Sequence, residues 1–321
     1  MMMMYVTLIG IFFASLLGTA GLNIVFRYLG RRGLMGNLYP NVRGGTPRAI
    51  GIIPFILLSL YLPTGFNNLV LIIGIAALID DLIGRKKIRY INIEWGQLSR
   101  GIGMILVILV GYPLMGVSSI LVALLIQPIN ISDMQPGTTC SIVIIMSIIT
   151  LIGMLIFRIP PLTDFPSYYT PLLILTVCIG YAPLDYYGKI MLGEVGNHSF
   201  AVALGISFYM LGGFWITLLF GIILVIMIAF IRRYTLHEFL TMKLRIYGPT
   251  FGDYIMDVLT GGGLGDLIRR ILFKNRQIEV KNPVLISLGF RRLLYNPYAP
   301  NHHRYQSNTV IEDSRDLRKF I

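Results

Sequence analysis

The stretch Leu69-Val-Leu-Ile-Ile-Gly-Ile-Ala-Ala-Leu-Ile-Asp80-Asp81-Leu-Ile-Gly84 is an apolar run with two neighbouring carboxylates near its end. An acidic side chain at the centre of a membrane helix costs roughly 2.5 to 3.5 kcal/mol on insertion scales, and adjacent carboxylates repel when both are ionised. A cation, a polyphosphate held through a cation, or a basic partner would offset that cost, so the pair is a functional candidate. The alternative is an ordinary helix end that faces water.

The whole chain is too apolar for a soluble globule. Of its 321 residues, 55 % are hydrophobic and 13 % charged, whereas soluble domains carry about a quarter charged residues. We therefore predict an all-α, polytopic transmembrane bundle in the cell membrane with about nine spans, near 4–26, 49–63, 68–83, 99–114, 117–127, 140–157, 171–183, 199–212 and 213–231. The two cysteines, Cys140 and Cys178, lie in apolar runs and indicate neither a disulfide framework nor a thiolate metal site.

The distribution of positive charge predicts an orientation. If the first span runs from outside to inside, every Lys and Arg except Arg158 falls in the inner segments 27–48, 84–100 and 182–198 or in the tail. The positive-inside rule then predicts an outside N-terminus and a cytoplasmic C-terminal tail. The net charge of +12 reflects this topology and attraction to anionic lipid. Aromatic and basic residues do not alternate as in a nucleic-acid groove, so we expect no nucleic-acid partner.

Two domains are expected: a transmembrane catalytic domain over residues 1–231 and a cytoplasmic basic tail over residues 232–321. The tail is amphipathic in places, and residues 264–273 are typical of a basic interfacial helix on the inner leaflet.

Polar residues gather in the loops that this topology assigns to the cytoplasm. Residues 31–51 form a loop rich in Gly, Pro and Arg, which could approach and bind an anion. A break at residues 127–137 holds Asn130 and Asp133, and Glu194 lies between two glycines. Four scarce carboxylates, Asp80, Asp81, Asp133 and Glu194, thus converge on one membrane face, an arrangement that suits oxygen-liganded Mg²⁺. Ordinary inner-face connections, with Asp133 as a helix cap, are the alternative.

The order of these motifs resembles the polyprenyl-phosphate N-acetylhexosamine-1-phosphate transferase family. The segment 45–51 (Gly-Thr-Pro-Arg-Ala-Ile-Gly) resembles the family's Gly-Thr-Pro-Thr-Met-Gly-Gly loop, and Asp80-Asp81 its Asp-Asp pair. The segment 130–133 (Asn-Ile-Ser-Asp) is similar to its Asn-x-x-Asp motif, and 189–197 (Lys-Ile-Met-Leu-Gly-Glu-Val-Gly-Asn) to its Phe-Met-Gly-Asp-x-Gly-Ser motif. The resemblance extends over residues 20–231 and indicates a distant member.

The chain also departs from the family pattern. Glu194 stands where the family has Asp, Asn197 stands where it has Ser, and the second Asp-Gly pair after Asp133 is missing. In the tail, 299–305 (Ala-Pro-Asn-His-His-Arg-Tyr) resembles the histidine motif of the family's peptidoglycan branch, although a surface histidine pair in a basic tail would look the same.

The resemblance implies roles for particular residues. It implies Mg²⁺ as cofactor, with Glu194 as ligand and Asp81 or Asp133 assisting. Asp80 would hold or deprotonate the lipid phosphate, and its role and that of Asp81 could be exchanged. Catalytic residues would then be Asp80, Asp81 and Asp133, and the substrate-binding residues would be Arg43, Thr46, Arg48, Asn130, Lys189, His302 and His303.

The activity implied is transfer of a sugar-1-phosphate from a UDP-sugar to polyprenyl phosphate at the cytoplasmic membrane face, with release of UMP, for cell-envelope precursors. The partners that the resemblance implies are a UDP-sugar, a polyprenyl phosphate lipid, the membrane and a second copy in a homodimer. Two other classes stay open: a catalytically diverged homologue that binds lipid or recruits partners, and a transporter that uses the carboxylates as a relay. The chain has no matched pair of interrupted helices that would favour a transporter.

Overall fold

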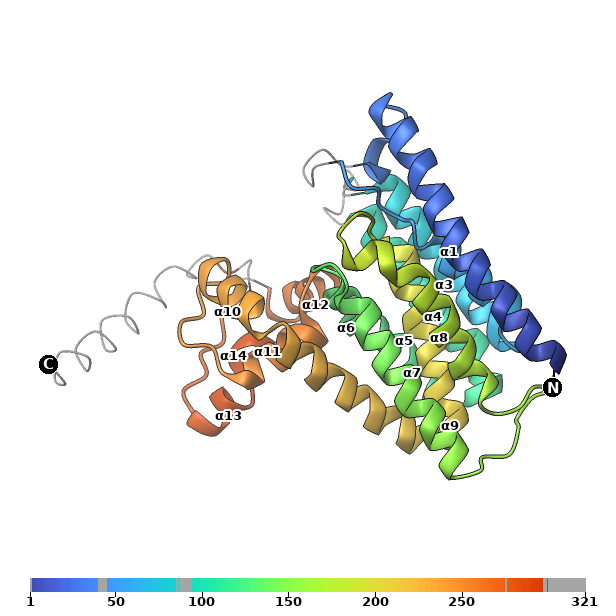
Figure 1. The fold of residues 1–321 in the computed structure, drawn as a ribbon. Helices are drawn as coiled ribbons and strands as arrows, with labels where there is room; N and C mark the ends of the chain where they lie inside the picture. Colours follow the sequence, from blue (N-terminus) through green and yellow to red (C-terminus); the bar gives the residue numbers. More distant parts are fainter. Residues whose placement is uncertain are drawn as a thin grey trace, which may run out of the picture. The chain divides into compact units, whose positions relative to one another are not determined.

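Apolar helices make up most of the chain. The computed structural model describes residues 2–39, 45–84, 86, 94–274, 276–296 and 299, without the side chains of residues 263, 264 and 267. Within these ranges the protein is all-helical and contains no β-strand (Figure 1), which confirms the predicted class. Three predicted site residues, Arg43, His302 and His303, lie outside the described residues.

The chain divides into two compact units, Met1–Leu224 and Val225–Ile321. The helices of the first unit are α1 (Met2–Arg31), the 3-10 turn η1 (Gly36–Leu38), α2 (Ile52–Tyr61), α3 (Phe66–Ile83), α4 (Trp95–Met115), α5 (Ser118–Leu124), α6 (Ile126–Ser132), α7 (Thr138–Ile156), α8 (Tyr169–Tyr186) and α9 (Gly193–Ile231), which continues into the second unit.

Five of these helices, α1, α3, α4, α7 and α9, are long and apolar enough to cross a membrane. A crossing needs about 20 residues, and α2 is shorter. The predicted span 117–127 is divided at Leu125 between α5 and α6. Helix α9 is interrupted at Gly212 and Gly213, where the backbone is not helical, and this is where the predicted spans 199–212 and 213–231 meet. Nine spans and their orientation stay predictions.

Small residues bring the helices of the first unit close together. A Cβ atom at Gly103 of α4 would lie 2.7 Å from the Ala76 Cβ of α3, and one at Gly180 of α8 would lie 2.7 Å from the Ser15 Cβ of α1. Ser15 Oγ donates a hydrogen bond to the Val177 carbonyl at 2.7 Å. Without water to drive association, helices in lipid depend on such close packing and on interhelical hydrogen bonds.

The loops predicted to face the cytoplasm meet at one end of this unit. Arg27 at the end of α1 donates to the Lys189 carbonyl between α8 and α9 at 2.6 Å, and Asn37 donates to the Leu82 carbonyl at the end of α3 at 3.0 Å. At the other end of the helices, Tyr169 Oη donates to the Tyr61 carbonyl at 2.9 Å.

The second unit is a small helical domain organised around buried ion pairs. Its helices are α10 (Arg233–Met242), α11 (Phe251–Thr260), α12 (Gly263–Phe273), α13 (Pro283–Ser287) and α14 (Phe290–Leu293). Thr250 and Asp253 form a capping box that begins α11. Asp253 also pairs with Arg291 at 2.9 Å, and Asp257 pairs with the buried Arg292. These pairs join α14 to α11.

Candidate functional site

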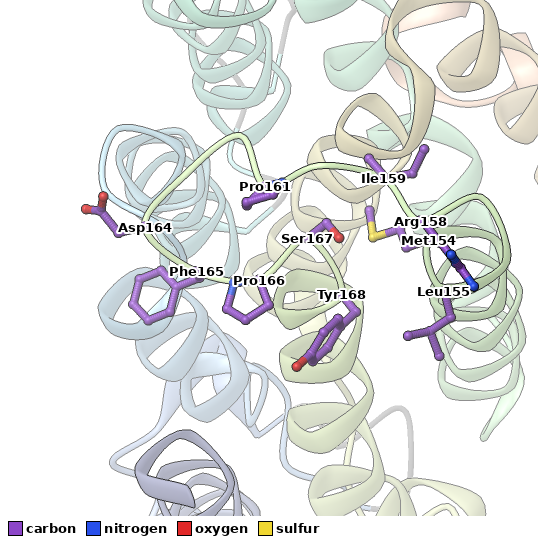
Figure 2. A pocket seen from close by; sticks show the side chains of 10 residues that line it. All are labelled: Met154, Leu155, Arg158, Ile159, Pro161, Asp164, Phe165, Pro166, Ser167 and Tyr168. Carbon is purple, nitrogen blue, oxygen red and sulfur yellow. The ribbon is translucent and has the colours of Figure 1, made fainter. Parts of the chain in front are cut away.

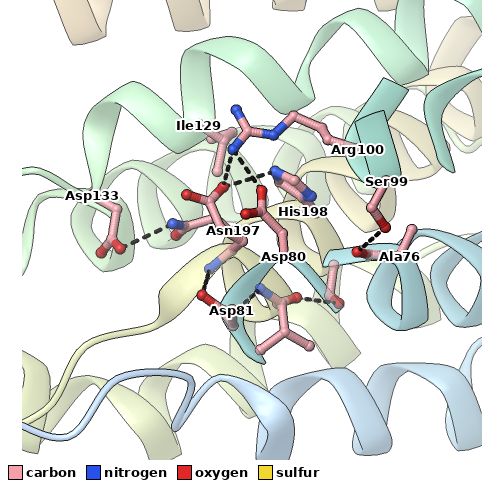
Figure 3. Close-up of polar contacts among 12 residues, drawn as sticks. Ala76, Asp80, Asp81, Ser99, Arg100, Ile129, Asp133, Asn197 and His198 are labelled. Carbon is pink, nitrogen blue, oxygen red and sulfur yellow. Dashed lines mark hydrogen bonds and ion pairs between the residues drawn. The ribbon is translucent and has the colours of Figure 1, made fainter. Parts of the chain in front are cut away.

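Asp80 occupies the last turns of α3 and faces the beginning of α4. Its Oδ2 atom accepts a hydrogen bond from Nη2 of Arg100 at 3.1 Å, and both side chains are largely buried. Helix α4 can come this close because residue 96 is glycine: a Cβ there would lie 1.7 Å from Asp80 Oδ1. Figure 3 shows the Arg100 guanidinium reaching toward Asp80.

Glu194, in the first turn of α9, faces the same guanidinium. Its Oε2 atom lies 2.9 Å from Arg100 Nη2 and 3.2 Å from His198 Nε2. Its Oε1 atom lies 3.4 Å from Arg48 Nη2. A single nitrogen of Arg100 therefore bridges carboxylates from two helices that are far apart in the sequence.

Asp81 supplies the N-terminal cap of α9 from another helix. Its Oδ1 atom accepts from the Glu194 amide at 3.1 Å and its Oδ2 atom from the Val195 amide at 3.0 Å. The first amides of a helix have no partner within it, and a negative charge there is favourable. Arg48 Nε lies 3.0 Å from Oδ1. A fully buried carboxylate thus has a polar partner on both oxygens.

The loop that carries Arg48 is held against the start of α9 by backbone bonds. The Ile50 amide donates to the Met191 carbonyl at 3.2 Å and the Gly51 amide to the Leu192 carbonyl at 3.1 Å. A Cβ at Gly51 would lie 2.5 Å from the Gly196 Cα, so both glycines are needed for this approach. The glycine-rich loop and the Glu194 motif, which lie far apart in sequence, thereby form one surface.

The remaining predicted residues surround this centre to different extents. Asp133, after α6, accepts a hydrogen bond from Asn197 Nδ2 of α9 at 2.9 Å (Figure 3). Asn130 is half-buried on the last turn of α6, and its side chain forms no hydrogen bond within the described chain. Thr46 is half-buried in the loop before Arg48, and Lys189 is exposed.

Arg100 and His198 are the two contributors that the sequence did not single out. Arg100 was counted among the cytoplasmic Lys and Arg residues that predict the orientation. A lone arginine at the edge of the apolar run 99–114 was the available signal, because buried cations in membrane helices need a partner.

The charges around Asp80, Asp81 and Glu194 affect how the expected Mg²⁺ could bind there. Asp80, Asp81 and Glu194 face two guanidinium groups, and no group of three or more His, Cys, Asp or Glu side chains in the described ranges is arranged to hold a metal ion. Mg²⁺ is commonly held by one or two carboxylates, with waters and substrate phosphates completing its shell. Each oxygen of Glu194 and Asp81 has an arginine, histidine or amide partner in this structure, so a metal ion would have to displace some of these partners.

A separate cavity of about 550 Å³ lies between the end of α7 and the start of α8. Figure 2 shows Met154, Leu155, Phe165 and Tyr168 on its walls. None of the predicted site residues lines it.

No protein-family model matches the chain, and a search of curated proteins gives no match. The function is therefore inferred from the residues and their geometry.

Proposed function

We propose that this protein transfers a sugar-1-phosphate from a UDP-sugar to polyprenyl phosphate at the cytoplasmic face of the cell membrane, as a distant member of the polyprenyl-phosphate N-acetylhexosamine-1-phosphate transferase family. The product would serve cell-envelope precursor synthesis. A phosphate oxygen of the lipid attacks the phosphorus that carries the sugar. The bond from that phosphorus to the oxygen of the departing nucleotide breaks, and UMP leaves.

One observation carries the proposal: Arg48, the Asp80-Asp81 pair and Glu194, chosen from three separate motifs, meet within hydrogen-bond and ion-pair distance. Asp133 joins the same turn of α9 through Asn197. Four motifs placed at random in a helical bundle would not be expected to meet at one end of it. A shared centre is what a two-substrate reaction requires.

The chain's own residues suit phosphoryl transfer, which depends on positioning and charge neutralisation more than on covalent help. Arg48 and Arg100 offer planar, bidentate donors for phosphate oxygens. When such an anion binds, Asp80 is released from Arg100 and can hold the acidic lipid headgroup or accept its proton. Asp133 and Asn130, one turn apart near α6, would orient the nucleotide, with Thr46 and Lys189 at the rim.

Mg²⁺, when held by Glu194 and Asp81, would neutralise the pyrophosphate and stabilise the leaving UMP.

The test is an assay of the purified full-length protein with a panel of UDP-sugars, Mg²⁺ and undecaprenyl or dolichyl phosphate. We expect UMP to appear only when both the lipid and the correct sugar nucleotide are present. Glu194→Gln should abolish UMP release while the protein remains folded, because glutamine keeps the size and loses the charge. Near-normal turnover by a folded Glu194→Gln protein would contradict the metal assignment.

The pairing of every central carboxylate favours a second candidate, a diverged homologue without catalysis. Glu194 has one methylene more than the aspartate of the family motif, and it reaches both Arg48 and Arg100 in this structure. Such a network stabilises the start of α9 with no substrate. This candidate predicts binding of polyprenyl phosphate without UMP release for any sugar nucleotide in the panel.

A further inference from the structure

Helix α12 in the second unit has an apolar face that no described residue covers. Ile268, Ile271 and Leu272 are 49 %, 66 % and 68 % exposed, and their spacing of three and four residues places them on one side of the helix. Three large apolar side chains in one exposed strip are unusual for a surface in water and mark an interaction site.

The buried side chain of Arg269 fixes the rotation of α12 about its axis. Arg269 is only 4 % exposed, and its Nη2 atom lies 2.6 Å from Asp266 Oδ1 and 2.9 Å from the Thr260 carbonyl of α11. Nη1 of Arg269 also donates to Thr260 Oγ1 at 3.1 Å. Three hydrogen bonds hold the buried Arg269 side chain inward, and Ile271, which lies nearly opposite on the helix, is thereby held outward.

Positive charge flanks the strip. Arg270 and Lys274 are exposed on the neighbouring side of α12, and Arg276 is exposed just beyond the helix. Residues 232–296 contain eleven Lys and Arg against five Asp and Glu. This charge complements an anionic surface, and an apolar strip bordered by cations is the pattern of helices that lie in the headgroup layer of a bilayer.

We propose that α12 docks on an anionic phospholipid surface, with Ile268, Ile271 and Leu272 inserted among the acyl chains and with Arg270 and Lys274 at the headgroups. The second unit would then be held against the same bilayer that the apolar helices cross. This proposal stands whether or not the protein transfers a sugar phosphate.

The experiment uses the full-length protein with Ile271→Cys carrying a nitroxide spin label, reconstituted in phosphatidylcholine nanodiscs with or without phosphatidylglycerol. Cys140 and Cys178 are fully buried, and the unsubstituted protein serves to measure any labelling of them. With anionic lipid we expect high collision of the label with oxygen and low collision with a water-soluble nickel chelate. A matched label at the exposed, acidic position Glu279 should show the reverse.

The charge requirement is tested by adding Arg270→Gln and Lys274→Gln to the labelled protein. Each basic residue near an anionic surface contributes about 1 kcal/mol, so the docking equilibrium should fall roughly thirtyfold when both are removed. A label at Leu272→Cys repeats the measurement if the first variant folds poorly.

Two results would overturn the proposal. Free access of the nickel chelate to position 271 in both lipid compositions would show that the strip stays in water. Protection from both oxygen and nickel, independent of lipid charge, would show that another protein or a second copy covers it.

Discussion

At the scale of single residues, the centre of the site depends on one guanidinium nitrogen. Arg100 Nη2 lies 3.1 Å from an oxygen of Asp80 and 2.9 Å from an oxygen of Glu194. Two buried carboxylates from different helices thus share one positively charged donor. A phosphate that takes over this donor would release Asp80 from its ion pair and leave Glu194 with Arg48 and His198.

Gly96 controls how closely Arg100 and Asp80 approach. We predict that Gly96→Ala disrupts the site, because the new Cβ would overlap Asp80 Oδ1 and force the carboxylate away. Gly101→Ala, on the same helix, has no heavy atom within 4 Å of its Cβ and is the matched control. UMP release should be lost in the first variant and retained in the second. Equal activity of the two would contradict the described geometry.

Removing Arg100 should also cost stability. Arg100→Leu leaves Asp80 and Glu194 buried without that partner, and loss of one member of a buried ion pair costs about 3 to 5 kcal/mol. The exposed pair of Lys281 and Glu279 is the comparison, since Lys281→Gln should change stability by less than about 0.5 kcal/mol. Apparent Tm values in a single detergent measure the difference. A Tm for Arg100→Leu equal to that of the unsubstituted protein would refute the burial of this pair.

The sequence was sufficient to identify the acidic residues of the site, but it did not indicate that Arg100 pairs with two of them. Asp80, Asp81, Asp133 and Glu194 stand out because carboxylates are scarce in an apolar chain. Arg100 does not, because a cation near a span end is equally typical of a positive-inside anchor. Which of these two roles applies depends on the rotation of α4 against α3, and that rotation is set by Gly96 and Gly103 packing rather than by any pattern within 99–114.

At the scale of elements, the start of α9 is where the motifs are joined. Asp81 caps this helix, the loop before Ile52 pairs with residues 191 and 192, and Asn197 reaches Asp133. The sequence predicts each of these segments separately. The sequence does not indicate which loop lies against which helix start, because those backbone contacts join residues more than a hundred positions apart.

The interruption of α9 is the element that the sequence located best. Gly213 has φ 65° and ψ −149°, a region that is essentially restricted to glycine. We predict that Gly213→Ala lowers the stability by about 1 to 3 kcal/mol through backbone strain alone, because no heavy atom lies near its Cβ. Gly10→Ala in α1, also with open space around its Cβ, should be neutral or stabilising. Similar apparent Tm values for both variants would mean that the chain continues helically through residue 213.

At the scale of the whole molecule, the composition was enough to predict a helical membrane protein. The number of spans was harder, because α2, α5 and α6 are short, and an apolar run does not reveal whether it crosses a bilayer or ends within it. The compact second unit was predicted as a basic tail with interfacial helices, and its compact packing was not predicted. Its order depends on the pairs of Asp253 with Arg291 and of Asp257 with Arg292, which no local pattern indicates.

Metal binding should be coupled to the nucleotide. Both oxygens of Glu194 and of Asp81 have arginine, histidine or amide partners in this structure, so a cation must compete with them. The pyrophosphate of a UDP-sugar would draw Arg48 and Arg100 away. We predict that Mn²⁺, as a probe for Mg²⁺, binds the full-length protein weakly alone and more tightly with UDP, as followed by titration calorimetry. Equal Mn²⁺ affinity with and without UDP would contradict this coupling.

The most direct test of the central claim is a time course of UMP release by the unsubstituted protein with polyprenyl phosphate and a UDP-sugar from the panel. The control is the same mixture without lipid. If the acids and arginines at the start of α9 form one site for both substrates, UMP should accumulate only with lipid and in equal amount to a lipid-linked sugar pyrophosphate. Folded protein that yields no UMP with any sugar nucleotide and lipid would contradict the account.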